Sequence, residues 1–140
     1  MMAEKNIIIA RDEQATLQLG AQLAQQIHPG QLIFLNGDLG VGKTTLVRGL
    51  VHGLGYTGKI KSPSFTLVES YGFDQFMLYH VDLYRLETPE ELEMLGFRDY
   101  LNENSICLIE WAEKAKDFLP KAELTINIDI TGAARRISIS

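Results

Sequence analysis

A glycine-rich segment between two regular elements limits the fold more than any other feature of this chain. Residues 37–44 read GDLGVGKT, which satisfies the pattern of a glycine, four further residues, and then Gly-Lys-Ser/Thr. The apolar run 32–35 precedes it and predicts a strand buried on both faces. The apolar spacing of residues 46–51 predicts a helix from Lys43 to about His52. A phosphate-binding loop requires this order of strand, loop and helix.

The chemistry of the loop explains why these residue types recur together. Glycines allow backbone conformations closed to other residues, so consecutive amide groups point into one concavity at the positive end of a helix. We expect Lys43 to neutralise the β- and γ-phosphates, Thr44 to bind Mg²⁺ through its hydroxyl, and Thr45 to reach another phosphate oxygen. The chain is therefore predicted to bind a nucleoside triphosphate and Mg²⁺ through Asp38, Gly40, Val41, Gly42, Lys43, Thr44 and Thr45.

Two carboxylates follow apolar runs elsewhere in the chain. Nucleotide hydrolysis also needs a carboxylate near the metal, commonly at the end of a neighbouring apolar strand. Glu110 follows the run 106–109 and is the predicted second Mg²⁺ ligand, although aspartate is commoner there and a surface acid is the alternative. Asp82 follows the run 77–81 and could orient the attacking water, or equally cap a turn. Lys43, Asp82 and Glu110 are the candidate catalytic residues.

Two further features near these motifs have open interpretations. The segment 61–66 reads KSPSFT, and its hydroxyls could sense the γ-phosphate or form a turn set by Pro63. Trp111, which follows Glu110, could be a core residue or part of an interface. No histidine has a histidine or cysteine neighbour at metal-ligand spacing, so a zinc site has no support.

The remaining pattern predicts an α/β architecture. Short apolar runs predict strands at 6–10, 106–109, 124–130 and 136–139. Apolar residues at four-residue spacing predict a helix over 12–27, and Thr88 with Glu91 predicts the start of a short capped helix. Two runs rich in aromatic and β-branched residues, 65–71 and 76–83, predict a hairpin. Strands alternating with helices favour a three-layer fold like that of P-loop nucleotide hydrolases, with a mixed, mainly parallel sheet and a central β-hairpin.

Length and charge restrict the remaining function classes. The 140 residues fall within the usual size of one domain, so we expect a single domain over 1–140. The net charge of −5 argues against a surface that holds a nucleic-acid backbone without a partner. No stretch approaches the ~20 apolar residues of a membrane span, and Glu4 and Lys5 stand where a signal peptide needs apolar residues. A cytoplasmic protein without membrane contact is expected.

Four motifs, taken in order, resemble those of the bacterial TsaE (YjeE) family. They read GDLGVGKTTL from Gly37, SPSFTL from Ser62, HVDLYRL from His80 and IEW from Ile109. Only the first is generic to nucleotide hydrolases, and the similarity spans nearly the whole chain. The resemblance implies a small ATPase needed for making threonylcarbamoyladenosine, the modified base beside the anticodon of tRNAs that read codons starting with adenosine.

The resemblance also implies a cofactor, partners and residue roles. ATP and Mg²⁺ are the implied cofactors. The implied partners are the transferase TsaD and its non-catalytic paralogue TsaB, and these two proteins would hold the tRNA. ATP hydrolysis would reset their complex between rounds, while the isolated chain is expected to be monomeric. By the family pattern, Thr44 and Glu110 bind Mg²⁺, Lys43 and the loop glycines bind phosphate, Asp82 supports hydrolysis, and Gln14 and Arg135 contact the nucleotide.

Two other functions stay open on the residues alone. A small-molecule kinase would need an acceptor pocket and an arginine-bearing lid, for which Arg85 and Arg98 are candidates. A nucleotide-gated binding module would need occupancy of the loop without hydrolysis. The sequence contains no guanine-reading Asn-Lys-x-Asp motif and no adenine signature. Hydrolysis by the isolated chain is expected to be weak, because no residue is an obvious strong general base.

Overall fold

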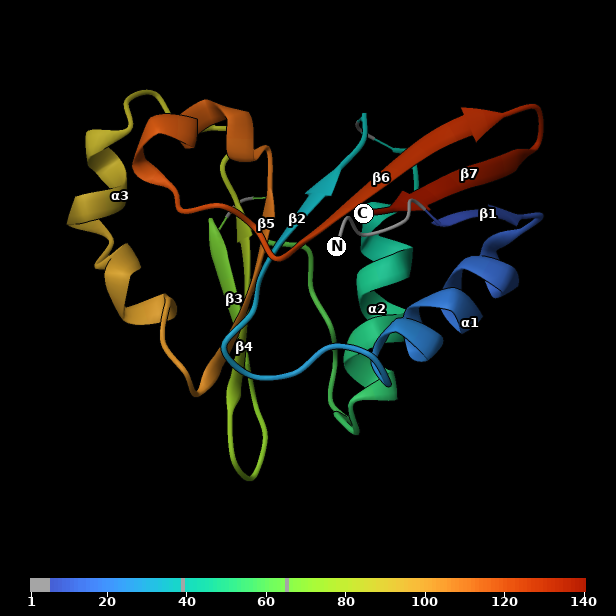
Figure 1. Cartoon of the computed structure of the whole chain (residues 1–140), viewed down its shortest axis with the longest axis horizontal. Helices are drawn as coiled ribbons and strands as arrows, with labels where there is room; N and C mark the ends of the chain where they lie inside the picture. Colours follow the sequence, from blue (N-terminus) through green and yellow to red (C-terminus); the bar gives the residue numbers. More distant parts are fainter. Residues whose placement is uncertain (1–5, 39, 65) are drawn as a thin grey trace.

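The computed structural model describes residues 6–38, 40–64 and 66–140, which form one seven-stranded sheet with helices on both faces (Figure 1). The elements in chain order are β1 Asn6–Ala10, α1 Glu13–Leu23, β2 Leu32–Asn36, α2 Lys43–Gly53, β3 Val68–Gly72, β4 Met77–Asp82, α3 Glu90–Met94, the 3₁₀ helix η1 Phe97–Tyr100, β5 Ser105–Glu110, the 3₁₀ helix η2 Ala112–Phe118, β6 Leu124–Thr131 and β7 Ala134–Ile139.

The sheet has the strand order β1-β7-β6-β2-β5-β4-β3. Its four middle strands β6, β2, β5 and β4 are parallel, whereas β1, β7 and β3 make antiparallel pairs at the two edges. The predicted mixed, mainly parallel sheet is confirmed. The hairpin of β3 and β4 is central in the sequence but lies at one edge of the sheet. The carboxyl ends of β2, β4 and β5 meet at one side, where Glu110 pairs in register with both Leu35 and Asp82.

Alternating side chains divide the core into two layers, as expected for strands buried on both faces. On β2, Ile33 and Leu35 belong to the core beneath α1 and α2, while Leu32 and Phe34 pack with residues of α3, η1 and η2 on the other face. This confirms the predicted three layers. Helices α1 and α2 cross so closely that a Cβ added to Gly20 or Gly49 would collide with backbone of the other helix. Their close packing sets the beginning of α1 beside the beginning of α2.

Several element boundaries differ from the sequence prediction. Helix α1 ends at Leu23 rather than continuing to residue 27. At its other end, Asp12 is the N-cap residue and accepts a hydrogen bond from the Ala15 amide at 2.8 Å. Strand β3 begins at Val68, because Leu67 has a positive φ of 69° and donates its amide to the carbonyl of Pro63. The predicted start of this strand, Phe65, lies outside the described residues.

The short helix α3 and the two 3₁₀ helices also differ from the prediction. The Glu91 carboxylate accepts a hydrogen bond from the Thr88 amide at 3.0 Å, as in a capping box. The N-cap residue of α3 is Pro89, however, so the prediction that Thr88 caps this helix was wrong. Neither η1 nor η2 was predicted, because such short tight turns lack a helical apolar period. Within the part of the chain that the structure describes, no helix is long and apolar enough to cross a membrane.

Candidate active site

The glycine-rich loop joins β2 to α2, which confirms the predicted order of strand, loop and helix. Gly40 and Gly42 have φ values of 77° and 112°, a region that favours glycine, and Gly42 is the N-cap of α2. Val41 between them is 2% exposed and anchors the loop in the core. Leu39 lies outside the described residues. The loop backbone is thus shaped around an anchored centre, with open space at Gly40.

Lys43 is buried at the first turn of α2. Its Nζ donates to the Gly37 carbonyl at 2.7 Å and lies 3.4 Å from Oε1 of Glu110. The same ammonium lies 4.7 Å from the centroid of the Trp111 ring, within the range of a cation–π contact. The positive charge is therefore held between the start of the loop and the end of β5.

The two predicted carboxylates lie next to each other beside this lysine. Asp82 ends β4 and Glu110 ends β5, in register, and their exposed fractions are 6% and 5%. The surface-acid interpretation of Glu110 was therefore wrong. Oδ1 of Asp82 accepts from the Tyr84 amide at 2.9 Å, so this side chain also caps the turn that follows β4. The structure thus brings together Lys43, Asp82 and Glu110, the three candidate catalytic residues.

His80 is a further member of the site that the sequence analysis did not assign. It is fully buried on β4, and its Nε2 makes a 2.5 Å hydrogen bond with Oε2 of Glu110. The available signal was its position two residues before Asp82, since such residues point to the same face of a strand.

The pKa values of the two carboxyls move in opposite directions. Burial alone would raise the pKa of Glu110, but the hydrogen bond and charge of His80, followed by the charge of Lys43, outweigh it and hold this pKa below its usual range. Burial raises the pKa of Asp82; the Tyr84 amide opposes this increase, while the charge of Glu110 adds to it. Opposed shifts in neighbouring carboxyls are typical of sites that need one ionised group and one proton acceptor.

Replacing Asp82 with asparagine is expected to stabilise the fold at pH 7 and to raise the midpoint of thermal unfolding. The raised pKa means that the folded state favours the neutral side chain, so the carboxylate present at pH 7 destabilises it. Asparagine is neutral and keeps an oxygen for the Tyr84 amide.

Thermal unfolding measured across pH would check this expectation. The difference between the variant and the wild type should shrink as pH falls from 7 towards 3.8, the ordinary pKa of aspartate, and should no longer change below that pH, because Asp82 is then neutral in both folded and unfolded chains. Asp129→Asn, at an exposed position, is the control for the loss of one charge. An unchanged or lower midpoint for Asp82→Asn at pH 7 would contradict the argument.

A cavity of about 260 Å³ adjoins the loop on the side of α1. Arg135 on β7 lines it and donates Nε to the Val41 carbonyl at 2.7 Å, so this predicted residue is tied to the loop. Gln14 is exposed in the first turn of α1 and does not line the cavity. The lining residues are Ala10, Asp12, Glu13, Thr16, Gly40, Val41, Gly42, Thr45, Ala133 and Arg135, of which Gly40, Val41, Gly42, Thr45 and Arg135 were predicted to bind the nucleotide.

A smaller recess of about 150 Å³ lies on the other side of the loop. Asp38 and Trp111 line it together with Asn36, Gly37, Glu113 and Asp129. Trp111 is half-buried, and its ring lies 4.9 Å from that of Tyr84, which is 42% exposed. The core interpretation of Trp111 is therefore incomplete, because this aromatic pair reaches the surface beside Lys43.

The hydroxyl-rich segment 61–66 forms a local turn next to the site. The hydroxyls of Ser62 and Ser64 lie 2.8 Å apart, and Thr66 donates to Glu69 at 3.2 Å. Leu67, which follows this segment, lies beside the carboxylate pair, because its carbonyl accepts a hydrogen bond from the Asp82 amide at 2.9 Å. A role in sensing the γ-phosphate stays a prediction, and Phe65 lies outside the described residues.

The site has the donor set that a magnesium nucleotide requires. Mg²⁺ prefers oxygen ligands, and Thr44 in the first turn of α2 and Glu110 supply a hydroxyl and a carboxylate. The buried ammonium of Lys43 and the amides at the start of α2 suit phosphate oxygens. The residues present therefore fit both groups.

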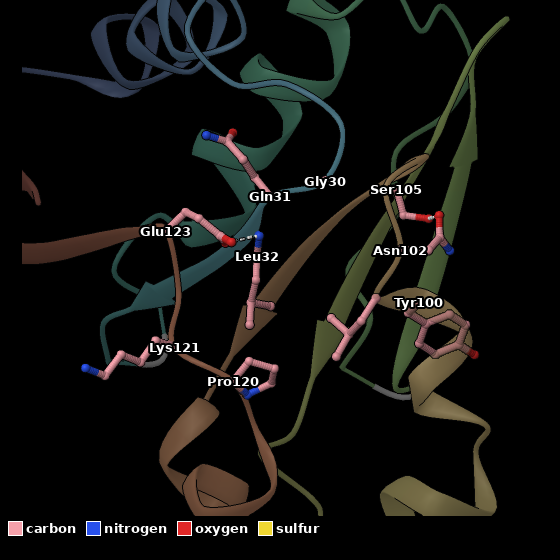
Figure 2. A pocket seen from close by; sticks show the side chains of 10 residues that line it. Gly30, Gln31, Leu32, Tyr100, Asn102, Ser105, Pro120, Lys121 and Glu123 are labelled. Carbon is pink, nitrogen blue, oxygen red and sulfur yellow. Dashed lines mark hydrogen bonds between the residues drawn. The ribbon is translucent and has the colours of Figure 1, made fainter.

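Another cavity, of about 170 Å³, lies at the opposite side of the sheet, by the first residues of β2 and β5 (Figure 2). The Glu123 carboxylate there accepts from the Leu32 amide at 2.6 Å, and the Ser105 hydroxyl donates to Asn102 at 3.1 Å. These polar groups already have partners that hold the strand ends and the loop 102–105 in place. None of the motif residues lines this cavity.

Comparisons with known proteins agree with the geometry. The family model described as threonylcarbamoyl adenosine biosynthesis protein TsaE matches residues 10–137. Proteins named tRNA threonylcarbamoyladenosine biosynthesis protein TsaE are similar over most of the chain: that of Haemophilus influenzae is 50% identical, covering 91% of this chain and 84% of the relative, and that of Rickettsia felis is 40% identical, covering 94% and 77%. The crystal structure of Bacillus subtilis YdiB superposes with a TM-score of 0.82 at 31% identity, covering 99% of this chain and 86% of YdiB.

Proposed function

Because this chain belongs to the TsaE family of threonylcarbamoyladenosine biosynthesis, we propose that it is a Mg²⁺-dependent ATPase whose turnover supports this modification of tRNA. One observation carries the proposal. The buried ammonium of Lys43 lies within 3.4 Å of the Glu110 carboxylate, in a phosphate loop, next to the strand-end carboxylate of Asp82. A binding loop alone would need neither carboxylate.

Each residue has a role that its position supports. The amides of the loop and Lys43 would bind the β- and γ-phosphates, and Thr44 and Glu110 would hold Mg²⁺. When bound, Mg²⁺ would neutralise charge on the phosphate oxygens. Asp82 would orient the attacking water and accept its proton, since burial makes this carboxyl the stronger base of the pair. Lys43 would stabilise the negative charge that develops on the γ-phosphate oxygens.

The nucleoside would lie in the cavity beside the loop. This cavity is continuous with Gly40, Gly42 and Thr45, and its wall from α1 and β7 offers both acceptors, such as Asp12, and a guanidinium, Arg135. ATP is the nucleotide we propose, on the basis of the family. The contact from Gln14 stays a prediction, because in the structure its neighbours Asp12 and Glu13 line the cavity instead.

The proposed partners are TsaD and TsaB in the cytoplasm. The net charge of −5 supports an arrangement in which these partners, rather than this chain, hold the tRNA. Tyr84 and Trp111 are an aromatic pair at the surface, and Trp111 also contacts Lys43, so a protein docked there could respond to the nucleotide. The isolated chain is proposed to be a monomer.

ATP hydrolysis measured with and without purified TsaB and TsaD tests the proposal. We expect a slow rate for the chain alone and at least a ~10-fold increase with both partners, since a partner can supply the charge or ordering that the site lacks. The Glu110→Gln variant reports hydrolysis by contaminants. A high rate that the partners leave unchanged would contradict the proposal, and transfer of the γ-phosphate to a metabolite faster than to water would indicate a kinase instead.

A further inference from the structure

His80 lies in the layer of the core that faces the loop. On β4 it shares a face with Leu78 and Asp82, and in register it pairs with Leu108, two residues before Glu110 on β5. It is fully buried, so its imidazole cannot contact solvent or a ligand at the surface. Within the described residues, its hydrogen-bond partner is the Glu110 carboxylate.

The two oxygens of Glu110 have different partners. Oε2 accepts from Nε2 of His80 at 2.5 Å, whereas Oε1 lies 3.4 Å from the ammonium of Lys43 at the loop. An ionised carboxylate can only accept hydrogen bonds, so Nε2 is the donor. The two contacts together fix the plane of the carboxylate, leaving one oxygen directed at the loop.

A histidine is a poor choice for packing alone at this position. Burying polar nitrogens is unfavourable unless each is hydrogen-bonded. Nδ1 of His80 has no hydrogen-bond partner in the described part of the chain, so the imidazole loses hydration at both nitrogens and regains one bond. That one bond is made to the carboxylate of the site. An apolar side chain of similar size would pack here at lower free energy, which indicates that the bond serves Glu110.

We propose that His80 is a positioning residue that holds one oxygen of Glu110 so that the other is presented to Mg²⁺ at the loop. The inference rests on the proposed function, because it takes Glu110 as a metal ligand. Without His80, the carboxylate can rotate and place both oxygens on Lys43, where they compete with phosphate for the ammonium. Groups that orient a metal ligand commonly change metal affinity by 10- to 100-fold, which sets the scale of the effect.

Three variants separate this role from packing. His80→Leu removes the donor at similar volume, and His80→Gln keeps an N–H donor at similar reach. Leu78→Val is the matched control, because Leu78 is equally buried on the same strand and face but pairs in register with Ile106, four residues before Glu110. For each protein, titration with fluorescent methylanthraniloyl-ADP gives the Mg²⁺ concentration that half-saturates nucleotide binding, and ATP hydrolysis gives a second value.

His80→Leu is expected to raise both half-saturating Mg²⁺ concentrations by about 10-fold. His80→Gln should recover most of this loss, and Leu78→Val should match the wild type. In the wild type without nucleotide, long-range proton–nitrogen NMR should show an imidazole protonated at Nε2, with a slowly exchanging proton. This last measurement needs neither metal nor activity.

The outcomes distinguish this inference from the proposed function. A Mg²⁺ requirement of His80→Leu within twofold of the wild type, a His80→Gln variant as impaired as His80→Leu, or an Nε2 without a protected proton would each overturn the positioning role. If the Mg²⁺ shifts appear as expected but the wild type does not hydrolyse ATP even with its partners, the proposed ATPase function fails while the role of His80 stands.

Discussion

Replacing Lys43 with alanine is expected to weaken ATP binding by about 100-fold, which corresponds to ~3 kcal/mol. Hydrogen bonds to charged groups contribute ~1.5 to 3 kcal/mol each, and this ammonium is buried where the phosphates would lie. Its removal also leaves the Glu110 carboxylate without the cation 3.4 Å away, so that carboxylate would then repel the nucleotide. Both effects act in the same direction.

Calorimetric titration with a non-hydrolysable ATP analogue in the presence of Mg²⁺ would measure the loss. Lys114→Ala is the matched control, because Lys114 is an exposed lysine 5.8 Å from the Tyr84 ring and its removal changes the net charge equally. This control should bind within about twofold of the wild type. A Kd for Lys43→Ala within threefold of the wild type, in a variant that circular dichroism shows to be folded, would refute the assignment of the loop.

Replacing Glu110 with glutamine is expected to slow ATP hydrolysis by about 100- to 1000-fold, the range seen when one preorganised charge-stabilising group is removed from an active site. Glutamine has nearly the same shape and keeps an oxygen that can accept from His80. It lacks the negative charge that the lowered pKa of Glu110 guarantees at pH 7. Nucleotide binding should therefore stay within about threefold of the wild type, since Lys43 and the loop amides are untouched.

Single-turnover hydrolysis and nucleotide titration on the same preparation would separate these two effects. Glu113→Gln is the control, because Glu113 is an exposed carboxylate only three residues away and lines the recess beside the loop. Full tRNA modification by Glu110→Gln over many turnovers would show that hydrolysis is dispensable, and the chain would then act as a nucleotide-gated binding module.

The candidate site could be predicted from the sequence as far as local patterns reach. The loop and the strand before it are contiguous, and Asp82 and Glu110 each follow an apolar run, so their placement at strand ends needs only the period of a strand. Their adjacency is a consequence of the parallel pairing of β4 with β5. The sequence pattern favoured a parallel sheet but contained no direct signal for that strand order.

Part of the candidate site depends on contacts between distant segments, which local sequence patterns do not predict. Arg135 reaches Val41 across 94 positions, and the contact requires β7 to lie beside β6 and β6 beside β2. His80 matters through Glu110, 30 positions away, and its position two residues before Asp82 indicates only a shared strand face, not this hydrogen bond. The contact from Gln14, implied by the resemblance, stays a prediction; its neighbours Asp12, Glu13 and Thr16 line the cavity.

The cavity beside the loop draws its walls from three segments that are far apart along the chain. Asp12 lies between β1 and α1, Gly40 and Gly42 lie in the loop, and Arg135 lies on β7. A nucleotide held there would contact residues next to both the first and the last strand, which pair with each other at the edge of the sheet (Figure 1). Separation of β1 from β7 would then require release of the nucleotide. Bound nucleotide would therefore stabilise this edge of the sheet against local unfolding.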